Sequence, residues 1–485
     1  MRSIYLIFIL SIIFLESTMS QNFYSQQFYD SYQNYKCENL NEKRIKHKDV
    51  IKRINALKKV KKFKIARVGK SVEGKDIHLI SIGTGKTDVL LWSQMHGDES
   101  TATMALFDIF NFLSATDDFD QFRNTILSKL TLHFIPMLNP DGADKFTRRN
   151  AINIDLNRDA LRLQFPESKI LKGIRDSLKP KFGFNLHDQN TRYSAGNSYR
   201  SATISFLAPA FNYEKDINEV RGNTMKLIVK IFNELSKFIP GHIAKYNDDF
   251  EPRAFGDNFI KWGTSSVLIE SGGWKNDLEK QFIRKLNYIA LLTGFHSIAN
   301  GTYKTASVKQ YNKIPNNDNL LFDALLRNLT YKSKNKKYKV DVGINRHERI
   351  TTDFSEDYFE STIDDWGDLS VFYGYDDFDL NGYEVRISKV FDLKNKDLKN
   401  IDTDKLLSEG YGFIKLKQDS IKSDFTKIPF NLILNDAKPN LKVEYLNNAN
   451  FTIWKKDKLR FNVINGFIYD VNSESYSILN GLIFK

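Results

Sequence analysis

The sequence contains almost no cysteine. Cys37 is the only one among 485 residues. One thiol cannot form an intrachain disulfide, which excludes a small disulfide-stapled scaffold. Apolar residues make up 41% of the chain and aromatic residues 13%, enough to build globular cores. The fold must therefore be stabilised by core burial or by a bound metal.

The sequence also has no uninterrupted apolar run of membrane-spanning length at its start. Arg2 precedes an apolar run over residues 4–15, and small residues follow at Thr18 and Ser20. A span needs about 20 apolar residues, whereas a charged start, a short apolar run and small residues are typical of a cleaved secretory signal. We predict a signal peptide over residues 1–20 and an exported protein, periplasmic or secreted, without stable membrane insertion after cleavage. An uncleaved anchor is the alternative.

Positive charge is in excess but is not concentrated. The net charge is +12 and the pI is about 9.2, which raises the question of a nucleic-acid or anionic partner. The lysines are scattered through segments that also contain acids, and the densest run, residues 58–64, is short and interrupted by apolar residues. We interpret the charge as solvation and expect no nucleic-acid partner.

The chain is longer than one hydrophobic core usually serves, and no internal repeat or low-complexity tract is present. After the signal we predict a lead-in segment, an α/β domain, a polar linker and a β-rich accessory domain, over residues 21–64, 65–302, 303–337 and 338–485. Acids and aromatics mix densely over residues 353–379. A sugar or calcium surface is one interpretation, and acidic loops between aromatic strand faces are the simpler one.

One stretch, residues 88–113, organises the α/β domain. A short apolar run reads as a buried strand, and an amphipathic helix pattern begins near Thr101. His96 and Glu99 lie between them. The carboxyl end of a strand in an open α/β sheet is where ligands bind, and an imidazole with a carboxylate suits zinc. A helix N-cap region is the alternative interpretation of the same residues.

Two later strands also end on polar side chains. The apolar run 182–186 ends at His187, and the run 265–269 ends at Glu270. His133, by contrast, lies inside an apolar strand and is expected to be a packed core residue. Three arginines, Arg148, Arg149 and Arg158, suit bidentate carboxylate binding, although a surface ion-pair cluster would explain them equally well.

The order of these polar motifs along the chain resembles that of the zinc carboxypeptidases of the carboxypeptidase A type. The resemblance covers about residues 65–300 and rests on four motifs and the strand-end His187: His96-Gly97-Asp98-Glu99, Asn139-Pro140-Asp141-Gly142, Asp155-Leu156-Asn157-Arg158 and Ile269-Glu270-Ser271-Gly272. It implies an α/β fold with a mixed central sheet and helices on both faces, followed here by the smaller β-rich domain.

The resemblance also implies roles for individual residues. His96, Glu99 and His187 would hold one zinc ion with a position left for water, and Glu270 would be the general base. Arg148, with Arg149 as the fallback, would stabilise the oxyanion. Asn157 and Arg158 would bind the terminal carboxylate of a peptide substrate.

The sequence departs from the family pattern in several places. Arg158 is followed by Asp159 and Ala160, and His187 is followed by Asp188 and Gln189. The family's mobile tyrosine has no firm counterpart, Tyr246 being the nearest. Arg253 could bind an acidic substrate side chain, but pairing with Glu251 or Asp257 is the favoured interpretation.

The expected function is therefore that of a zinc metallocarboxypeptidase acting on exported or extracytoplasmic peptides with a free C-terminus. A zinc amidase or deacylase acting on cell-wall peptides or acyl-amino acids would use the same metal with a different clamp. A binding protein that kept the fold without turnover is the third alternative. A pro-segment role for residues 21–64 is a further alternative that the sequence leaves open.

Overall fold

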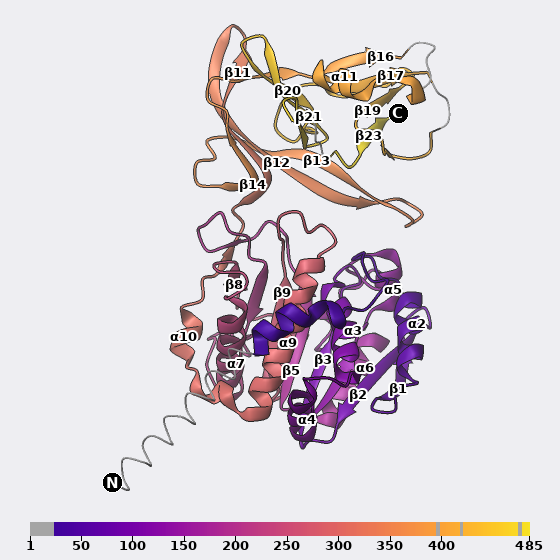
Figure 1. Cartoon of the computed structure of the whole chain (residues 1–485), viewed down its shortest axis with the longest axis vertical. Coiled ribbons are helices and arrows are strands. Elements are labelled where there is room, and N and C mark those ends of the chain that lie inside the picture. Colours follow the sequence, from indigo (N-terminus) through magenta and orange to yellow (C-terminus); the bar gives the residue numbers. More distant parts are fainter. Residues whose placement is uncertain (1–23, 394–397, 418–420, 474–477) are drawn as a thin grey trace. The chain divides into compact units, whose positions relative to one another are not determined.

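The structure is a computed structural model that describes residues 24–393, 398–417, 421–473 and 478–485. The predicted signal peptide lies outside these residues. The chain forms two compact units, Met1–Asn319 and Leu320–Lys485 (Figure 1). Within the described ranges, no helix is both long and apolar enough to cross a membrane.

The first unit is built on an eight-stranded mixed sheet, which confirms the predicted fold class. The strand order is β1-β2-β4-β3-β5-β9-β7-β8, and β4, β3, β5 and β9 run parallel in the centre. The sheet strands are β1 (Lys64–Lys70), β2 (Asp76–Gly83), β3 (Thr87–Trp92), β4 (Leu130–Ile135), β5 (Phe182–Asp188), β7 (Ile204–Leu207), β8 (Ile243–Lys245) and β9 (Ser265–Ser271).

Helices cover both faces of this sheet because alternate side chains of each central strand point to opposite faces. Val89 and Leu91 of β3 join one apolar cluster with helices α3 and α9, whereas Leu90 and Trp92 join another with α6 and α8. The helices are α2 (His47–Leu57), α3 (Thr101–Ser114), α4 (Asp120–Lys129), α5 (Pro140–Lys145), α6 (Pro166–Leu178), α7 (Glu219–Leu235), α8 (Phe255–Lys261), α9 (Gln281–Asn300) and α10 (Val308–Asn312).

The segment predicted as a lead-in is part of the first unit's core. Residues 24–31 are helical, η1 (Tyr32–Asn34) and α2 follow, and Phe28, Tyr32 and Tyr35 are buried with side chains of α3, α4 and α9. Phe28 lies in the first of these helical segments, Tyr32 lies in η1, and Tyr35 follows directly after η1. The segment is continuous with the core of the unit that carries the motifs.

The predicted linker over residues 303–337 is wrong. Its first part forms η3 (Thr302–Thr305), α10 and β10 (Asn317–Asp318), and Tyr303, Tyr311 and Ile314 are buried in the first unit. Strand β10 pairs with β6 (Ser194–Ala195). The remainder forms β11 (Leu321–Ser333), the first strand of the second unit. The segment is polar in composition, but its few large apolar side chains are buried and determine where the first unit ends.

The second unit is β-rich, as predicted, but begins at residue 320. One sheet has the order β13-β12-β11-β15-β20-β21-β22, with β14 paired to β11, and the other has the order β16-β17-β19-β23-β18. Its elements beyond β11 are β12 (Lys336–Ile350), β13 (Asp357–Gly367), β14 (Tyr373–Asp379), β15 (Glu384–Ile387), β16 (Lys389–Asp392), η4 (Leu398–Asn400), α11 (Thr403–Ser408), β17 (Tyr411–Leu416), β18 (Phe425–Thr426), β19 (Asn431–Leu434), β20 (Phe451–Lys455), β21 (Lys458–Ile464), β22 (Phe467–Asp470) and β23 (Gly481–Phe484).

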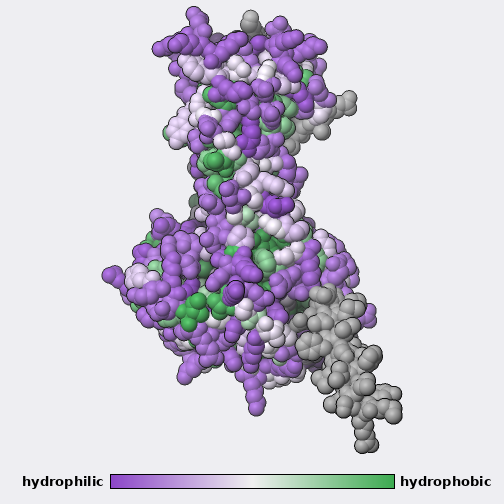
Figure 2. Space-filling view, turned by 90° about the vertical axis from the view of Figure 1, so that its left-hand side faces the viewer, coloured by the Kyte–Doolittle hydropathy of each residue, from purple (hydrophilic) through white to green (hydrophobic). Residues whose placement is uncertain are grey.

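Much of the acidic and aromatic segment 353–379 is strand and not loop, forming β13 and β14. Arg327 pairs with Asp377 there, and Asn328 donates to Asp379. Hydrophilic residues dominate the face of the molecule shown in Figure 2, with smaller hydrophobic areas between them.

Candidate metal centre and active site

The site is assembled at the carboxyl ends of three neighbouring parallel strands. The segment carrying His96 and Glu99 follows β3, His187 lies near the end of β5, and Glu270 lies near the end of β9. His187 and Glu270 are direct partners in the β5–β9 register. Parallel strands bring their carboxyl ends to one edge of a sheet, so residues more than 170 positions apart in sequence meet there.

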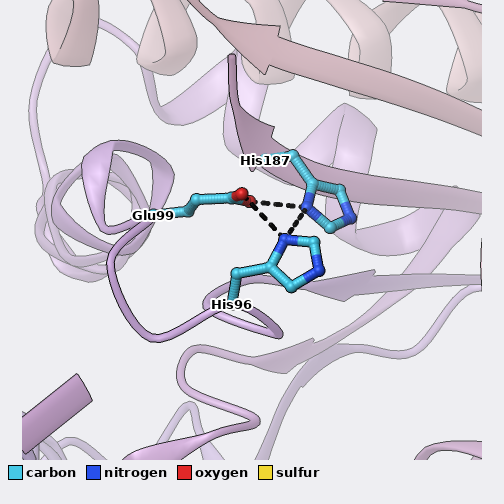
Figure 3. Close-up of side chains that lie close together, drawn as sticks. All are labelled: His96, Glu99 and His187. Atoms are coloured by element: carbon cyan, nitrogen blue, oxygen red, sulfur yellow. Dashed lines mark hydrogen bonds and ion pairs between the residues drawn. The ribbon is translucent and has the colours of Figure 1, made fainter. Parts of the chain in front are cut away.

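His96, Glu99 and His187 form one buried cluster, as Figure 3 shows. The Nδ1 of His96 lies 2.7 Å from Oε1 of Glu99, and the Nδ1 of His187 lies 2.6 Å from Oε2. The two Nδ1 atoms are 3.1 Å apart. His96, Glu99 and His187 are 2%, 8% and 2% exposed, respectively. One potential ligand atom from each residue lies within 4.8 Å of the others, so a single ion could contact all three.

Asp155 fixes the orientation of His96 and was missed by sequence reasoning. Its Oδ1 lies 3.1 Å from Nε2 of His96, and its Oδ2 accepts a hydrogen bond from Nε of Arg148. A carboxylate on the second ring nitrogen of a histidine leaves the first free to bind a metal. The Asp155-Leu156-Asn157-Arg158 motif contains this signal, although the resemblance implies roles only for its last two residues.

Buried charges set the protonation of this cluster. Burial lowers the pKa of His96, but the negative charge of Glu99 and the contact with Asp155 outweigh it and raise that pKa to about 9. Burial also opposes the charged form of Glu99, yet both histidines hold the pKa of its carboxyl well below its ordinary value. The cluster therefore favours an ionised Glu99, the form that binds a cation.

Arg148 reaches the cluster, whereas its fallback Arg149 does not. Nη1 of Arg148 lies 3.1 Å from Nδ1 of His96 and 3.2 Å from Oε1 of Glu99. Arg149 instead donates to the backbone oxygen of Asn153. The Arg148 side chain is 43% exposed, so its guanidinium adjoins the buried cluster and also meets solvent.

Glu270 is buried close to the same charges. It is 8% exposed, and burial followed by the negative charge of Glu99 raises the pKa of its carboxyl well above the ordinary value. A carboxyl with a raised pKa can accept and return a proton near neutral pH. This raised pKa sets Glu270 apart from Glu99, whose pKa the two histidines hold well below its ordinary value.

Asn157 and Arg158 lie in η2 (Leu156–Arg158). Asn157 contacts the first residue of α8, and Arg158 contacts the loop before that helix. Oδ1 of Asn157 accepts a hydrogen bond from the backbone N–H of Phe255 at 2.8 Å, and Nε of Arg158 lies 3.3 Å from Oε2 of Glu251. Arg253 forms a bidentate pair with Glu251 at 2.9 and 2.8 Å. The pairing favoured for Arg253 is thus confirmed.

Tyr246 and His133 lie in different surroundings, and only Tyr246 is close to the site. Tyr246 is partly buried, and burial together with the negative charge of Glu270 raises the pKa of its hydroxyl, which places it near the base. His133 lies in β4 between Ser81 and Asp88, 2.8 and 2.9 Å from its two nitrogens. It is a packed core residue, as predicted.

Residues 52–201 match the family model described as zinc carboxypeptidase. This stretch of the first unit is therefore similar to the zinc carboxypeptidases. The matched range includes the His96, Glu99 and His187 cluster and ends before Glu270. The placement of Glu270 beside that cluster comes from the sheet register and not from the family match.

Curated carboxypeptidases are similar to parts of this chain. Carboxypeptidase SOL1 of Arabidopsis thaliana is 32% identical over 126 residues, 22% of this chain and 26% of the relative. Probable carboxypeptidase 2 of Arthroderma benhamiae is 25% identical over 194 residues, 39% of this chain and 34% of the relative. The chain thus spans about a quarter to a third of the length of these relatives.

A solved structure with a related description is the metallo-carboxypeptidase from Burkholderia cenocepacia. It has 18% sequence identity and a TM-score of 0.43, covering 53% of this chain and 69% of that one.

The cluster fits the metal that the family name implies. Two imidazole nitrogens and one carboxylate are a common zinc ligand set of catalytic sites. Both histidines present Nδ1 to the same carboxylate, and Asp155 engages the other nitrogen of His96. This arrangement directs two donor nitrogens and two carboxylate oxygens at one point in the interior.

Proposed function

We propose that the first unit is a zinc-dependent metallocarboxypeptidase that removes residues from the free C-terminus of peptides. The observation that carries this proposal is the convergence of His96, Glu99 and His187 beside Glu270 at one edge of the sheet. In this proposal the three residues of the cluster hold one zinc ion. When bound, zinc would polarise the scissile carbonyl and lower the pKa of a coordinated water.

Glu270 supplies the proton transfers. Its carboxylate takes a proton from the attacking water as the water oxygen bonds to the carbonyl carbon, and then gives that proton to the departing amine as the C–N bond breaks. The buried environment that raises the pKa of Glu270 supports both halves of this transfer. Arg148, at the edge of the cluster, donates hydrogen bonds to the oxygen that gains negative charge.

Asn157 and Arg158 select a free terminus. Their neighbouring positions in η2 allow an amide and a guanidinium to bind one carboxylate together. Glu251 is the present partner of Arg158 at 3.3 Å, and it also has a bidentate partner in Arg253. A substrate carboxylate that displaced Glu251 from Arg158 would therefore leave Glu251 still paired. Because Glu251 has two arginine partners, Arg158 could bind a substrate carboxylate without leaving Glu251 unpaired.

The proposal also includes export of the protein, which places its substrates outside the cytoplasm. Residues 1–20 support it, with a charged start, a short apolar run and small residues before the expected cleavage point. Recovery of the protein only from the cytoplasm, with residues 1–20 still attached, would contradict export.

The decisive comparison uses the Glu270→Gln variant and two forms of one peptide. The substitution keeps the shape and removes the base, so we expect kcat to fall by about 10²-fold or more with zinc content unchanged. A peptide amidated at its C-terminus should be cleaved far more slowly than the free acid. Arg158→Met should remove that preference, whereas Arg162→Met, an exposed arginine nearby, should preserve it.

Two results would contradict the proposal. Unchanged turnover in Glu270→Gln would show that Glu270 is not the base. Equal cleavage of free and amidated peptides by the unaltered enzyme would remove the clamp role from Asn157 and Arg158 and favour an amidase. Zinc binding without hydrolysis of either peptide would favour the binding-protein alternative.

A further inference from the structure

A buried lysine lies behind the proposed metal centre. Lys280 immediately precedes α9, with φ of 52°, and is 8% exposed. Its Nζ lies 3.1 Å from Oδ2 of Asp188 and 3.1 Å from the backbone oxygen of Ser271. A buried ammonium is costly unless it is paired and hydrogen-bonded. These two acceptors satisfy that requirement and connect β5 with β9.

Each partner of Lys280 adjoins a residue of the site. Asp188 follows His187, and Ser271 follows Glu270. The same Oδ2 of Asp188 accepts a hydrogen bond of 2.6 Å from the hydroxyl of Thr101, two residues after Glu99. The backbone N–H of Asp188 also points to Oε2 of Glu99 at 3.3 Å. Lys280 and Asp188 together therefore connect the start of α3, which follows β3, with the ends of β5 and β9.

We propose that Lys280 is a positioning residue that, through Asp188 and Ser271, holds Glu99, His187 and Glu270 in register. This inference rests on the proposed function, because it assigns Lys280 a part in placing zinc ligands and the base. It gives a role to Asp188, which departs from the family pattern. Loss of the outer partners of metal ligands typically lowers metal affinity 10- to 100-fold.

An ion pair that serves only stability would give a different pattern of effects. Its loss would lower the unfolding temperature without changing the zinc affinity or kcat of the molecules that remain folded. A positioning role predicts that both fall even when the fold is intact. Zinc affinity, kcat and KM therefore separate the two roles, and zinc affinity does so without reference to turnover.

The test uses Lys280→Met, Lys280→Arg and the double variant Lys280→Met with Asp188→Asn in the full chain. Zinc affinity is measured by competition with a chromophoric chelator, and kcat and KM with a peptide that has a free C-terminus. We expect Lys280→Met to lower zinc affinity about 10- to 100-fold and to lower kcat with little change in KM. Lys280→Arg keeps the positive charge and can donate to both Asp188 and Ser271, so it should retain most of the zinc affinity and most of kcat.

The double variant protects the test against simple misfolding. It removes both charges, which leaves no unpaired carboxylate in the interior, so it should unfold at a higher temperature than Lys280→Met. Its zinc affinity should still be about tenfold or more below that of the unaltered chain, because the link to Ser271 is lost. If Lys280→Met does not fold, the double variant and Lys280→Arg decide the question.

Arg123→Met is a matched control. Arg123 is also a buried cation, 2% exposed, that pairs with carboxylates, Asp117 and Asp120, and donates to a backbone oxygen, that of Phe112. It touches none of the site residues. We expect this variant to lose stability while its folded molecules keep their zinc affinity and kcat.

Two results would overturn the inference. One is a folded double variant with the zinc affinity and kcat of the unaltered chain. The other is a loss of zinc affinity in Arg123→Met as large as that in Lys280→Met. Failure of the unaltered chain to bind zinc would overturn both the proposed function and this inference. Zinc binding without peptide hydrolysis would contradict the proposed function alone, and zinc affinity would still decide the role of Lys280.

Discussion

At the scale of single residues, each ring nitrogen of His96 contacts a different carboxylate. Nε2 contacts Asp155 and Nδ1 contacts Glu99, and this double contact with carboxylates raises the pKa of His96 to about 9. The imidazole is therefore protonated at neutral pH in the metal-free chain. Zinc binds only the neutral ring, so it must displace a proton.

This displacement predicts a pH-dependent zinc affinity. His96 carries its proton below a pH of about 9, so lowering the pH strengthens the competing proton and weakens zinc binding. Between pH 7 and 9 we expect the apparent affinity to rise about tenfold per pH unit and then to level off. Titration against a chelator whose own pH dependence is known measures this slope.

Asp155→Asn provides the comparison for this prediction. The amide lacks the charge that holds the proton on His96, so levelling should begin at a lower pH. The affinity on the plateau should fall about tenfold or more because the ring is less firmly oriented. An affinity independent of pH between 7 and 9 would contradict the assignment of His96 as a ligand.

The positions of these residues differed in how far the sequence could predict them. The meeting of His96, Glu99, His187 and Glu270 at one edge of the sheet was predictable because each lies at the end of a strand or shortly after it. Lys280 was not, because it follows no strand and its partners are known only once β5 and β9 are paired. Contacts of this kind depend on which strand ends are neighbours in the sheet. A local sequence pattern does not show which strands pair.

At the scale of elements, the N-terminal segment is tied to the helices that frame the site. Asp108 of α3 and Arg284 of α9 form a buried ion pair. Asp108 also accepts hydrogen bonds from the hydroxyl of Tyr32 and the backbone N–H of Cys37, and Arg284 donates to the backbone oxygen of Leu40. These contacts argue against a removable pro-segment, because its loss would leave buried polar groups unpaired.

Arg284→Met tests this tie. The substitution leaves Asp108 as an uncompensated buried charge, so we expect the free energy of unfolding to fall by about 3–5 kcal/mol. Chemical denaturation measures the change, and proteolysis should now cut the chain within residues 24–46. Arg67→Met, which removes an exposed ion pair with Asp76, should change the free energy by less than about 1 kcal/mol. An equally small effect in Arg284→Met would contradict the structural role of the segment.

Elements with a clear period were predictable, and those without one were not. The strand and helix of residues 88–113 appear as β3 and α3. Two alternating runs joined at residues 73–75 predict a hairpin, and the structure has it as β1 and β2. The apolar residues of 461–469 predict one strand, but the structure has two, because Asn465 and Gly466, both with positive φ, turn the chain between β21 and β22. Residues 441–445 also have a strand pattern but lie outside the strands of the structure.

At the scale of the whole molecule, the chain consists of two compact units. The described residues contain one cluster of histidine, cysteine or acidic side chains that could hold a metal, and it lies in the first unit. The acidic residues of β14 are at least partly engaged with Arg327 and Asn328. Two units were predictable from length alone, but their boundary at Asn319 was not, because it depends on Tyr303, Tyr311 and Ile314 packing backward.

The most direct test of the central claim is the zinc content of the purified full chain, measured by elemental analysis after exchange into metal-free buffer. The account predicts about one zinc ion per chain, and a value near zero for His187→Ala, which removes one ligand from the cluster. His133→Ala, which alters a packed histidine of β4, should keep the zinc. Equal zinc in the unaltered chain and in His187→Ala would contradict the account.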